Sequence, residues 1–201
     1  MRLPAILATA ATALLLALPA SAQISVSQIS AYLNGFRTAA SDFTQVNGDG
    51  SISTGSLQIR RPGSARFDYD APNNGLVIAG GGQVAIFDPV SNQPPEQYPL
   101  SQTPLSLILA DRVDLARSGM VVRHGGDATQ TAITLQDPAH PEYGSIQLVL
   151  TPDPVTLRQW VITDDAGSQT TVILGDMRTG VQIGSSAFNI PVELRRRGLS
   201  D

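Results

Sequence analysis

The stretch IRRPGSARFDYDAP, residues 59–72, joins two segments in which apolar and polar residues alternate. A proline and a glycine follow the two arginines, which predicts a turn between two extended segments. Side chains two residues apart in a strand lie on the same face, so Phe67 and Tyr69 share one face. Asp68 and Asp70 lie on the other and keep it in water. The stretch predicts a hairpin with one apolar face, and it leaves open why two arginines precede the proline.

Apolar residues recur with a period of two along most of the chain, a pattern typical of strands with one buried face. The positions that follow it are Leu57 and Ile59, Phe67 and Tyr69, Val84 and Ile86, Ile133 and Leu135, Ile146, Leu148 and Leu150, Trp160 and Ile162, and Val181 and Ile183. Turn signals separate these runs at residues 47–50, 74–75, 80–82, 125–127 and 164–167. Many short strands at hairpin spacing predict one antiparallel sheet, curled into a barrel or a sandwich.

Two segments depart from the strand pattern and predict helices. In residues 25–38, apolar residues at spacings of three and four form one face. Residues 102–116 begin with Thr103 as the N-cap and Pro104 at the first helical position. The leucines and the isoleucine that follow cover more than half of the circumference. We therefore expect this second helix to bury itself against the open side of the curled sheet.

The first twenty-two residues have the pattern of a secretory signal peptide. Arg2 supplies the positive start, an apolar stretch shorter than a membrane span follows, and A-S-A at 20–22 is a cleavage signature. We therefore expect residues 1–22 to be removed and residues 23–201 to form a single domain, exported to the periplasm. The chain has no cysteine, which excludes disulfides, a thiol nucleophile and a lipid-modified cysteine anchor.

The charge pattern does not favour a nucleic-acid partner. The formal net charge is −4, and arginine supplies every basic residue since the chain has no lysine. A mildly acidic chain without a basic patch in its body is a poor nucleic-acid binder. The single run of like charge, residues 195–197, is interpreted as a solvated tail.

No motif in the chain predicts catalysis or a bound metal. QVNGDGSI, residues 45–52, resembles the middle of a calcium-binding loop, but Gln and Ser stand at the two outer positions where calcium needs carboxylates. We interpret it as a hairpin turn. His124 and His140 are the only histidines, both are expected in loops, and neither has a partner at a recognisable spacing. The two carboxylates of FDYD follow one strand rather than flank a cleft. We expect a protein that is not an enzyme and has no cofactor.

The inward positions of the curled sheet and the second helix define a candidate interior. They are Leu57, Ile59, Phe67, Tyr69, Ile78, Val84 and Ile86 from the strands, and Leu105 and Ile108 from the helix. Periodicity alone does not separate a packed core from an apolar cavity. The residues by themselves predict a mainly β fold with a helical lid, suited to an apolar ligand.

Several longer stretches, taken in order, resemble one family. They are FTQ at 43–45, GSLQIRRPGSARFDYDAP at 55–72, LVIAGGGQVAIFDP at 76–89, TPLSLIL at 103–109, LRQWVITDDAGSQTTVILGDMRTG at 157–180 and FNIPVEL at 188–194. In these stretches the chain resembles the periplasmic outer-membrane lipoprotein carriers of the LolA family. The resemblance implies an unclosed, strongly curved antiparallel β-barrel, a half-barrel, covered by short helices. A Phe at position 67, where the family often has Trp, implies a more aliphatic lining.

The resemblance also implies a function. Such carriers accept acylated lipoproteins from an inner-membrane ABC-type releasing complex, shield the acyl chains and deliver them to an outer-membrane receptor or to the outer membrane itself. The family's functional arginine matches Arg61, which would hold the empty cavity closed as a lid latch, and the interior positions above would line the acyl-chain cavity. A carrier that exchanges partners is expected to be a monomer. A half-barrel that carries or senses free lipid or glycolipid, a hydrolase, and a binding module with a packed interior remain alternatives.

Overall fold

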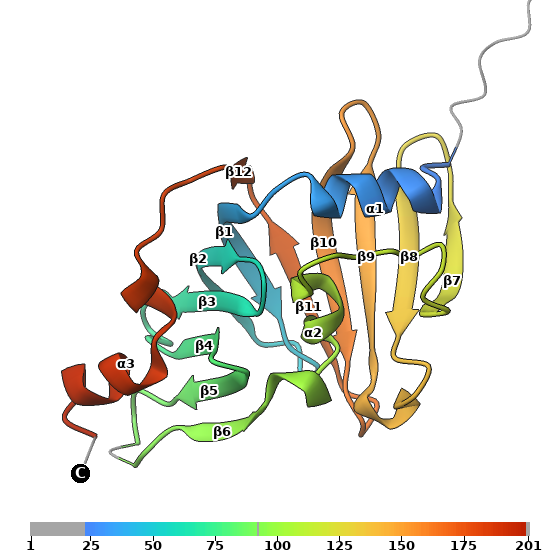
Figure 1. Ribbon diagram of the computed structural model, residues 1–201. Helices are drawn as coiled ribbons and strands as arrows, with labels where there is room; N and C mark the ends of the chain where they lie inside the picture. Colours follow the sequence, from blue (N-terminus) through green and yellow to red (C-terminus); the bar gives the residue numbers. More distant parts are fainter. Residues whose placement is uncertain (1–22, 92, 200–201) are drawn as a thin grey trace, which may run out of the picture.

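The structure, a computed structural model, describes residues 23–91 and 93–199 of the chain (Figure 1). Within them one antiparallel sheet contains twelve strands. The strands are β1 (Thr38–Val46), β2 (Ile52–Arg60), β3 (Ser64–Tyr69), β4 (Leu76–Gly80), β5 (Gln83–Phe87), β6 (Glu96–Pro99), β7 (Val121–Gly126), β8 (Thr131–Gln136), β9 (Ser145–Thr151), β10 (Thr156–Thr163), β11 (Gln169–Leu174) and β12 (Arg178–Thr179).

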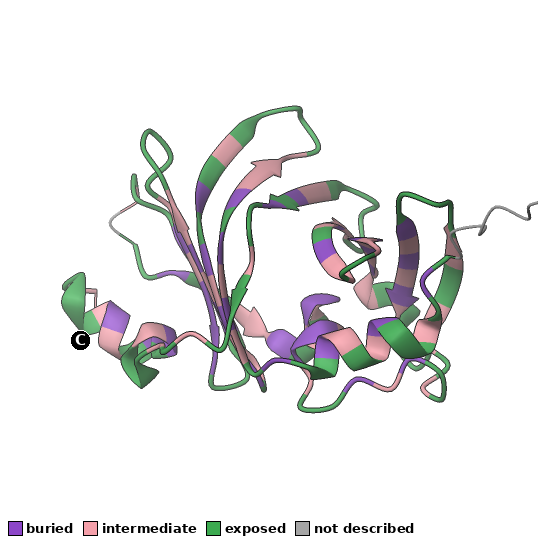
Figure 2. Ribbon diagram, turned by 90° about the horizontal axis from the view of Figure 1, so that it is seen from above, coloured by how far each residue is buried: buried purple, intermediate pink, exposed green. Residues whose placement is uncertain are grey.

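The sheet is curved and not closed. Hydrogen-bonded neighbours follow the order β6-β5-β4-β3-β2-β1-β11-β10-β9-β8-β7, and β12 pairs with β1. Because β6 and β7 each end this path, two strand edges remain where a barrel would have none. Seen from above, the sheet bends around the helices on its inner side (Figure 2). The predicted fold class, a mainly β half-barrel with short helices, is confirmed.

Short helices complete the fold. They are α1 (Val26–Asn34), the 3-10 turn η1 (Leu100–Gln102), α2 (Leu105–Leu109), the 3-10 turns η2 (Pro141–Tyr143) and η3 (Ser185–Phe188), and α3 (Ile190–Arg196). The first helix begins at a capping box, in which Ser25 and Gln28 each satisfy the other's backbone N–H. It buries Ile29 and Leu33, as the spacing of its apolar residues predicts.

The main core lies between the inner face of the sheet and the helices α1 and α2. β9 shows how the period of two builds it, because Ile146, Leu148 and Leu150 are all fully buried and alternate with half-buried residues. Full burial of each such side chain stabilises the fold by about 1.5–3 kcal/mol. The alternating strands therefore provide most of the apolar surface that packs in the main core and stabilises the curved sheet.

A second, smaller core lies on the outer face of β4 and β5. Leu76 and Ile78 of β4 and Phe87 of β5 pack there with Ile190 of α3. At Gly80 an added Cβ would lie 2.0 Å from the carbonyl oxygen of Phe188, so only glycine allows the C-terminal segment to come this close. The outer face of β4 and β5 is therefore buried under the C-terminal segment.

Three segments differ from the sequence-based expectations. The helix expected over 102–116 is only Leu105–Leu109, preceded by η1, and the Thr103 hydroxyl bonds back to the carbonyl of Leu100 instead of capping the helix. The strand expected around Val181 and Ile183 is absent, because β12 ends at Thr179. The α3 helix is not predicted by periodicity.

Within the described residues, no helix combines the length and apolar character needed to cross a membrane. The predicted signal peptide, residues 1–22, lies outside the described residues.

Candidate functional site

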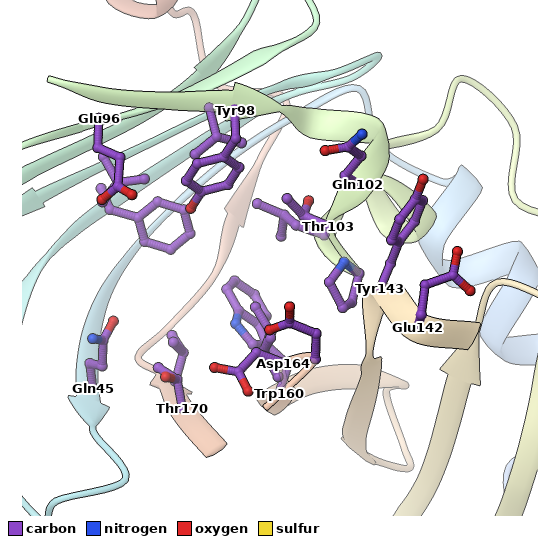
Figure 3. A pocket seen from close by; sticks show the side chains of 18 of the residues that line it. Gln45, Glu96, Tyr98, Gln102, Thr103, Glu142, Tyr143, Trp160, Asp164 and Thr170 are labelled. Atoms are coloured by element: carbon purple, nitrogen blue, oxygen red, sulfur yellow. The ribbon is translucent and has the colours of Figure 1, made fainter. Parts of the chain in front are cut away.

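A cavity of about 820 Å³ lies on the inner side of the sheet (Figure 3). Its volume is in the upper part of the range of about 300–1,000 Å³ that is typical of ligand pockets. Strands β1, β3 to β6, β10 and β11 form its walls, with η1, the start of α2 and η2 at its sides. The apolar and aromatic lining consists of Phe67, Tyr69, Val77, Val84, Tyr98, Pro104, Leu105, Tyr143, Trp160, Ile162 and Val172.

Aromatic rings organise one wall of this cavity. Phe43 packs edge-to-face against Phe67 and Tyr69, with ring centroids 5.6 and 5.2 Å apart, and Phe67 packs edge-to-face against Trp160 at 6.3 Å. The Tyr69 hydroxyl donates to Oε1 of Gln45 at 2.7 Å. Burial raises the pKa of Tyr69, so this hydroxyl stays protonated and acts as a donor. The wall is therefore apolar, and the polar ends of Tyr69 and Gln45 pair with each other.

Acidic side chains lie at the exposed mouth of the cavity. Glu96, Glu142, Asp164 and Asp165 are among its lining residues, which include no arginine or histidine. His140 lies nearby and hydrogen-bonds to Glu142 at 2.9 Å, which lowers the pKa of that carboxyl group. The mouth therefore carries negative charge around an apolar interior.

Arg61 joins the corner between β2 and β3 to the helical side of the cavity. Its side chain is 5% exposed. Nε and Nη2 donate to the carbonyl oxygen of Ala110, at 2.9 and 2.7 Å, and Nη1 donates to the carbonyl oxygen of Leu33. Further contacts reach Oδ1 of Asn34 at 3.3 Å and the carbonyl oxygen of Asp111 at 3.4 Å. We call these contacts the Arg61 junction.

The Arg61 junction connects the ends of two helices. Leu33 and Asn34 end α1, and Ala110 follows the last residue of α2. The last carbonyl groups of a helix have no partner inside the helix, and they favour a cation. One planar guanidinium, with five N–H donors, can satisfy several of them at once.

Neighbouring contacts fix the lid segment, residues 100–115, to the same place. Asn34 accepts from the N–H of Val113 at 3.0 Å and donates to the Val113 carbonyl oxygen at 2.7 Å. The N–H of Gly63 donates to the carbonyl oxygen of Leu109 at 2.8 Å. Arg61 is therefore the central member of a polar network that joins the sheet corner, α1 and the lid segment.

Burial lowers the pKa of Arg61, and the nearby charge of Arg37 acts in the same direction while Asp111 opposes it. No carboxylate accepts a hydrogen bond from Arg61 among the described residues, because its partners are carbonyl and amide oxygens. The guanidinium remains charged at any physiological pH. The junction consists of charge-assisted hydrogen bonds without a paired counterion.

The nine predicted interior residues fall into four places. Phe67, Tyr69, Val84 and Leu105 are lining residues of the cavity. Leu57, Ile59 and Ile108 are buried in the main core, outside the cavity lining. Ile78 lies on the outer face of the sheet in the second core, and Ile86 is 36% exposed.

The remaining motifs lie away from this cavity. Residues 47–51 form the turn between β1 and β2, where Asn47 bonds to Ser51 through the backbone. His124 lies in β7 rather than in a loop, and its Nε2 atom is 2.9 Å from the carbonyl oxygen of Ile24. In the described part of the chain, no three side chains of metal-ligating type come together.

The sequence did not identify Trp160 or the acidic residues as parts of the site. Glu96, Glu142 and the Asp164–Asp165 pair come from β6, η2 and the turn after β10, so no local spacing connects them. Trp160 followed the strand pattern on one face with Ile162, but nothing in the pattern distinguished a cavity wall from packed core.

The chain is similar in sequence to known proteins. The family model described as outer membrane lipoprotein carrier protein LolA matches residues 34–191. The outer-membrane lipoprotein carrier protein of Pseudomonas aeruginosa is 26% identical over 176 residues, 83% of each chain. That of Methylococcus capsulatus is 26% identical over 170 residues, 81% of each chain. A LolA superfamily protein from Nitrosomonas europaea aligns in structure with a TM-score of 0.43 and 10% identity, over 83% of this chain and 98% of that one.

Proposed function

Because this chain belongs to the LolA family of outer-membrane lipoprotein carrier proteins, we propose that it is a periplasmic carrier chaperone for acylated lipoproteins. It would shield the acyl chains of lipoproteins released from the inner membrane by an ABC-type complex. It would then deliver them to an outer-membrane receptor or to the membrane itself. This function requires no covalent chemistry and no cofactor.

The observation that carries the proposal is an apolar cavity beside a lid segment that accepts hydrogen bonds from one buried arginine. Each methylene group removed from water contributes about 0.8 kcal/mol. An acyl chain that enters the cavity therefore gains more than a small polar ligand would gain from the same walls. The acidic mouth keeps the outer part of the site wet.

The Arg61 junction opposes acyl-chain binding, because its hydrogen bonds must break when the lid segment opens. Hydrogen bonds to a charged group contribute about 1.5–3 kcal/mol each. Breaking one is offset by burying roughly two to four methylene groups. The three bonds to Ala110 and Leu33 together correspond to roughly six to twelve methylene groups, which one long acyl chain supplies. Cargo can therefore open the lid, and the junction re-forms when cargo leaves. Arg61 thus acts as a latch that lowers affinity enough for release.

Native mass spectrometry of the protein from a periplasmic extract tests the cargo. A bound species with the mass of an acylated protein, lost on extraction with organic solvent, is the expected result. A bound free lipid or glycolipid would change the cargo and favour the alternative carrier. A protein that is empty and does not bind a hydrophobic dye would contradict both.

A delivery assay tests the latch. Arg61→Leu is expected to take up lipoprotein and to retain it when outer-membrane vesicles are added. Arg60→Leu is the matched control, since Arg60 lies on the neighbouring position over the ring of Phe188, 4.8 Å from its centroid, away from the junction. Normal onward transfer by Arg61→Leu would refute the latch.

A further inference from the structure

The indole of Trp160 is an anomaly in the cavity wall. The residue is 1% exposed, and its Nε1 atom is buried without a hydrogen-bond partner. Among the described residues it is the sole buried side-chain nitrogen or oxygen in this condition. Buried polar groups in native proteins are nearly always paired, so each exception requires a physical explanation.

The indole of Trp160 cannot avoid this unpaired N–H by acting as an acceptor. The indole N–H is a donor only, so it can be satisfied only by an acceptor. Its neighbours across the sheet, Leu148 and Val172, are apolar, and Phe67 packs edge-to-face against it. A phenylalanine would fill much of the same space without an unpaired N–H.

The polar groups nearby already have partners or lie elsewhere. Tyr69 and Gln45 bond to each other, and the acidic side chains are exposed at the mouth. Figure 3 shows the Trp160 ring among the residues that line the cavity, between the strand side and the lid side. A ligand that displaces Phe67 or the lid segment would therefore meet one free donor in an apolar wall.

We propose that the N–H of Trp160 binds the carbonyl oxygen of an acyl linkage when a lipid occupies the cavity. This inference rests on the proposed function and names the part of the cargo that the site recognises. The hydrocarbon chain fills the apolar space, and the carbonyl group at its head pairs with the donor that has no partner among the protein's own groups.

The charge at the mouth favours a neutral linkage over a free fatty acid. A carboxylate head group would have to pass Glu96, Glu142 and the Asp164–Asp165 pair, all of like charge. An ester or amide carbonyl group is neutral, accepts a hydrogen bond and costs less to remove from water. An ether linkage of the same length presents no carbonyl group to the donor.

Competition with a hydrophobic dye tests this with two soluble probes. Dioctanoylglycerol carries ester carbonyl groups, and dioctylglycerol is its ether counterpart with the same chain length. The native protein is expected to bind the ester about five-fold more tightly, the ratio that corresponds to one neutral hydrogen bond of about 1 kcal/mol. In Trp160→Phe the ratio of the ester affinity to the ether affinity is expected to fall to about one, because the N–H that distinguishes the two probes is absent.

A second measurement needs no variant. Trp160 is the one tryptophan of the chain, so the protein has a single indole N–H resonance in a nitrogen–proton spectrum. Addition of the ester probe is expected to move it downfield, as hydrogen bonding does, and the ether probe is not. The bis-octanamide of the same three-carbon backbone then distinguishes ester from amide, because only a linkage whose carbonyl group pairs with the indole N–H moves the resonance downfield.

The outcomes separate this inference from the proposed function. If ester and ether bind equally to the native protein and leave the indole resonance unmoved, the role of Trp160 is wrong while a lipid carrier remains. If neither probe displaces the dye, the proposed function itself fails.

Discussion

Two arginines of the same hairpin hold helical segments on opposite faces of the sheet, and they use different acceptors. Arg61 reaches the carbonyl groups of Leu33 and Ala110 on the inner side. Arg66, on β3, reaches the outer side, where it forms two bonds of 2.7 Å to the carboxylate of Asp68. It also donates to the carbonyl oxygen of Ala187 at 3.1 Å and approaches Glu193 of α3 at 3.5 Å. The inner junction is made with neutral oxygens alone, whereas the outer one includes two carboxylates.

The difference predicts which helical segment can move. When Arg61 leaves its acceptors, no counterion remains buried, and water or cargo can take its place. Separating Arg66 from the C-terminal segment would remove one of three cations around a carboxylate that is itself 4% exposed, and it would also break the bond to Ala187, so it costs more. The inner contact is suited to repeated opening, and the outer contact is suited to permanent attachment of the C-terminal segment.

The pKa shifts of the two arginines have opposite directions, because only Arg66 bonds to carboxylates. Burial lowers the pKa of Arg61. Burial also acts to lower the pKa of Arg66, but the hydrogen bond and charge of Asp68, with Glu193, raise it overall. For Glu193 the two effects are reversed in sign. Burial acts to raise its pKa, but Arg197, Arg196 and Arg66 together lower it.

The largest expected effect is the loss of the outer contact. Arg66→Leu should lower the free energy of unfolding by about 3 kcal/mol, because it removes the nearest partner of Asp68 and one of the cations around Glu193. Urea unfolding measures this. The loss should be the same with and without bound lipid, since the outer contact does not open.

Arg60→Leu serves as the comparison for that measurement. Its guanidinium lies over Phe188 on the same outer face, and a cation–π contact of this kind contributes about 0.5–1 kcal/mol. If Arg66→Leu were no more harmful than Arg60→Leu, the carboxylate network would not hold α3.

The inner contact should behave differently. Arg61→Leu is expected to lower the free energy of unfolding of the empty protein by about 2 kcal/mol, because the carbonyl groups of Leu33 and Ala110 lose a charged donor. With saturating dioctanoylglycerol the loss should disappear, since these bonds are already broken in the loaded state. By linkage the variant should bind the probe roughly 30-fold more tightly. An equal loss in both states would place the junction outside the opening motion.

A pH titration sharpens the comparison further. The pKa of Glu193 is lowered in the folded protein, so its stabilising effect is fully present above the unfolded pKa of about 4.3 and is lost as the pH falls through the lower folded value. Unfolding measured from neutral pH into this acidic range should show a decline that Glu193→Gln reduces. The effect should be smaller than that of Arg66→Leu, because protonated Glu193 still accepts hydrogen bonds. A Gln variant with the native pH dependence would refute this role.

Local patterns in the sequence predicted the elements that bury one regularly spaced face. The alternation of Ile146, Leu148 and Leu150 identified β9 because one face of it is fully buried. The spacing of Ile29 and Leu33 identified α1 for the same reason. Arg61 was selected by resemblance rather than by pattern, and its backbone partners lie 28 and 49 residues away.

The features that the sequence did not predict depend on contacts between distant residues. The run at 195–197 was expected to be a solvated tail, but it includes the end of α3, and Arg196 and Arg197 pair with the buried Glu193. Ile78 was expected to face inward, and it lies outward because α3 covers that face. The unpaired nitrogen of Trp160 has no signal in the sequence at all, since it is defined by what surrounds it.

The smallest expected effect tests whether charge or shape makes the inner contact. Arg61→Lys keeps a cation near the helix ends but replaces the planar fork with a single ammonium group, which cannot reach Leu33 and Ala110 in the same geometry. We expect about three-fold tighter binding of dioctanoylglycerol than in the native protein, well below the change in Arg61→Leu, as measured by dye competition. Native affinity would mean that charge alone closes the lid segment. Affinity equal to that of Arg61→Leu would mean that the guanidinium fork is the whole contact, and that the inner junction depends on geometry as strictly as the outer one depends on charge.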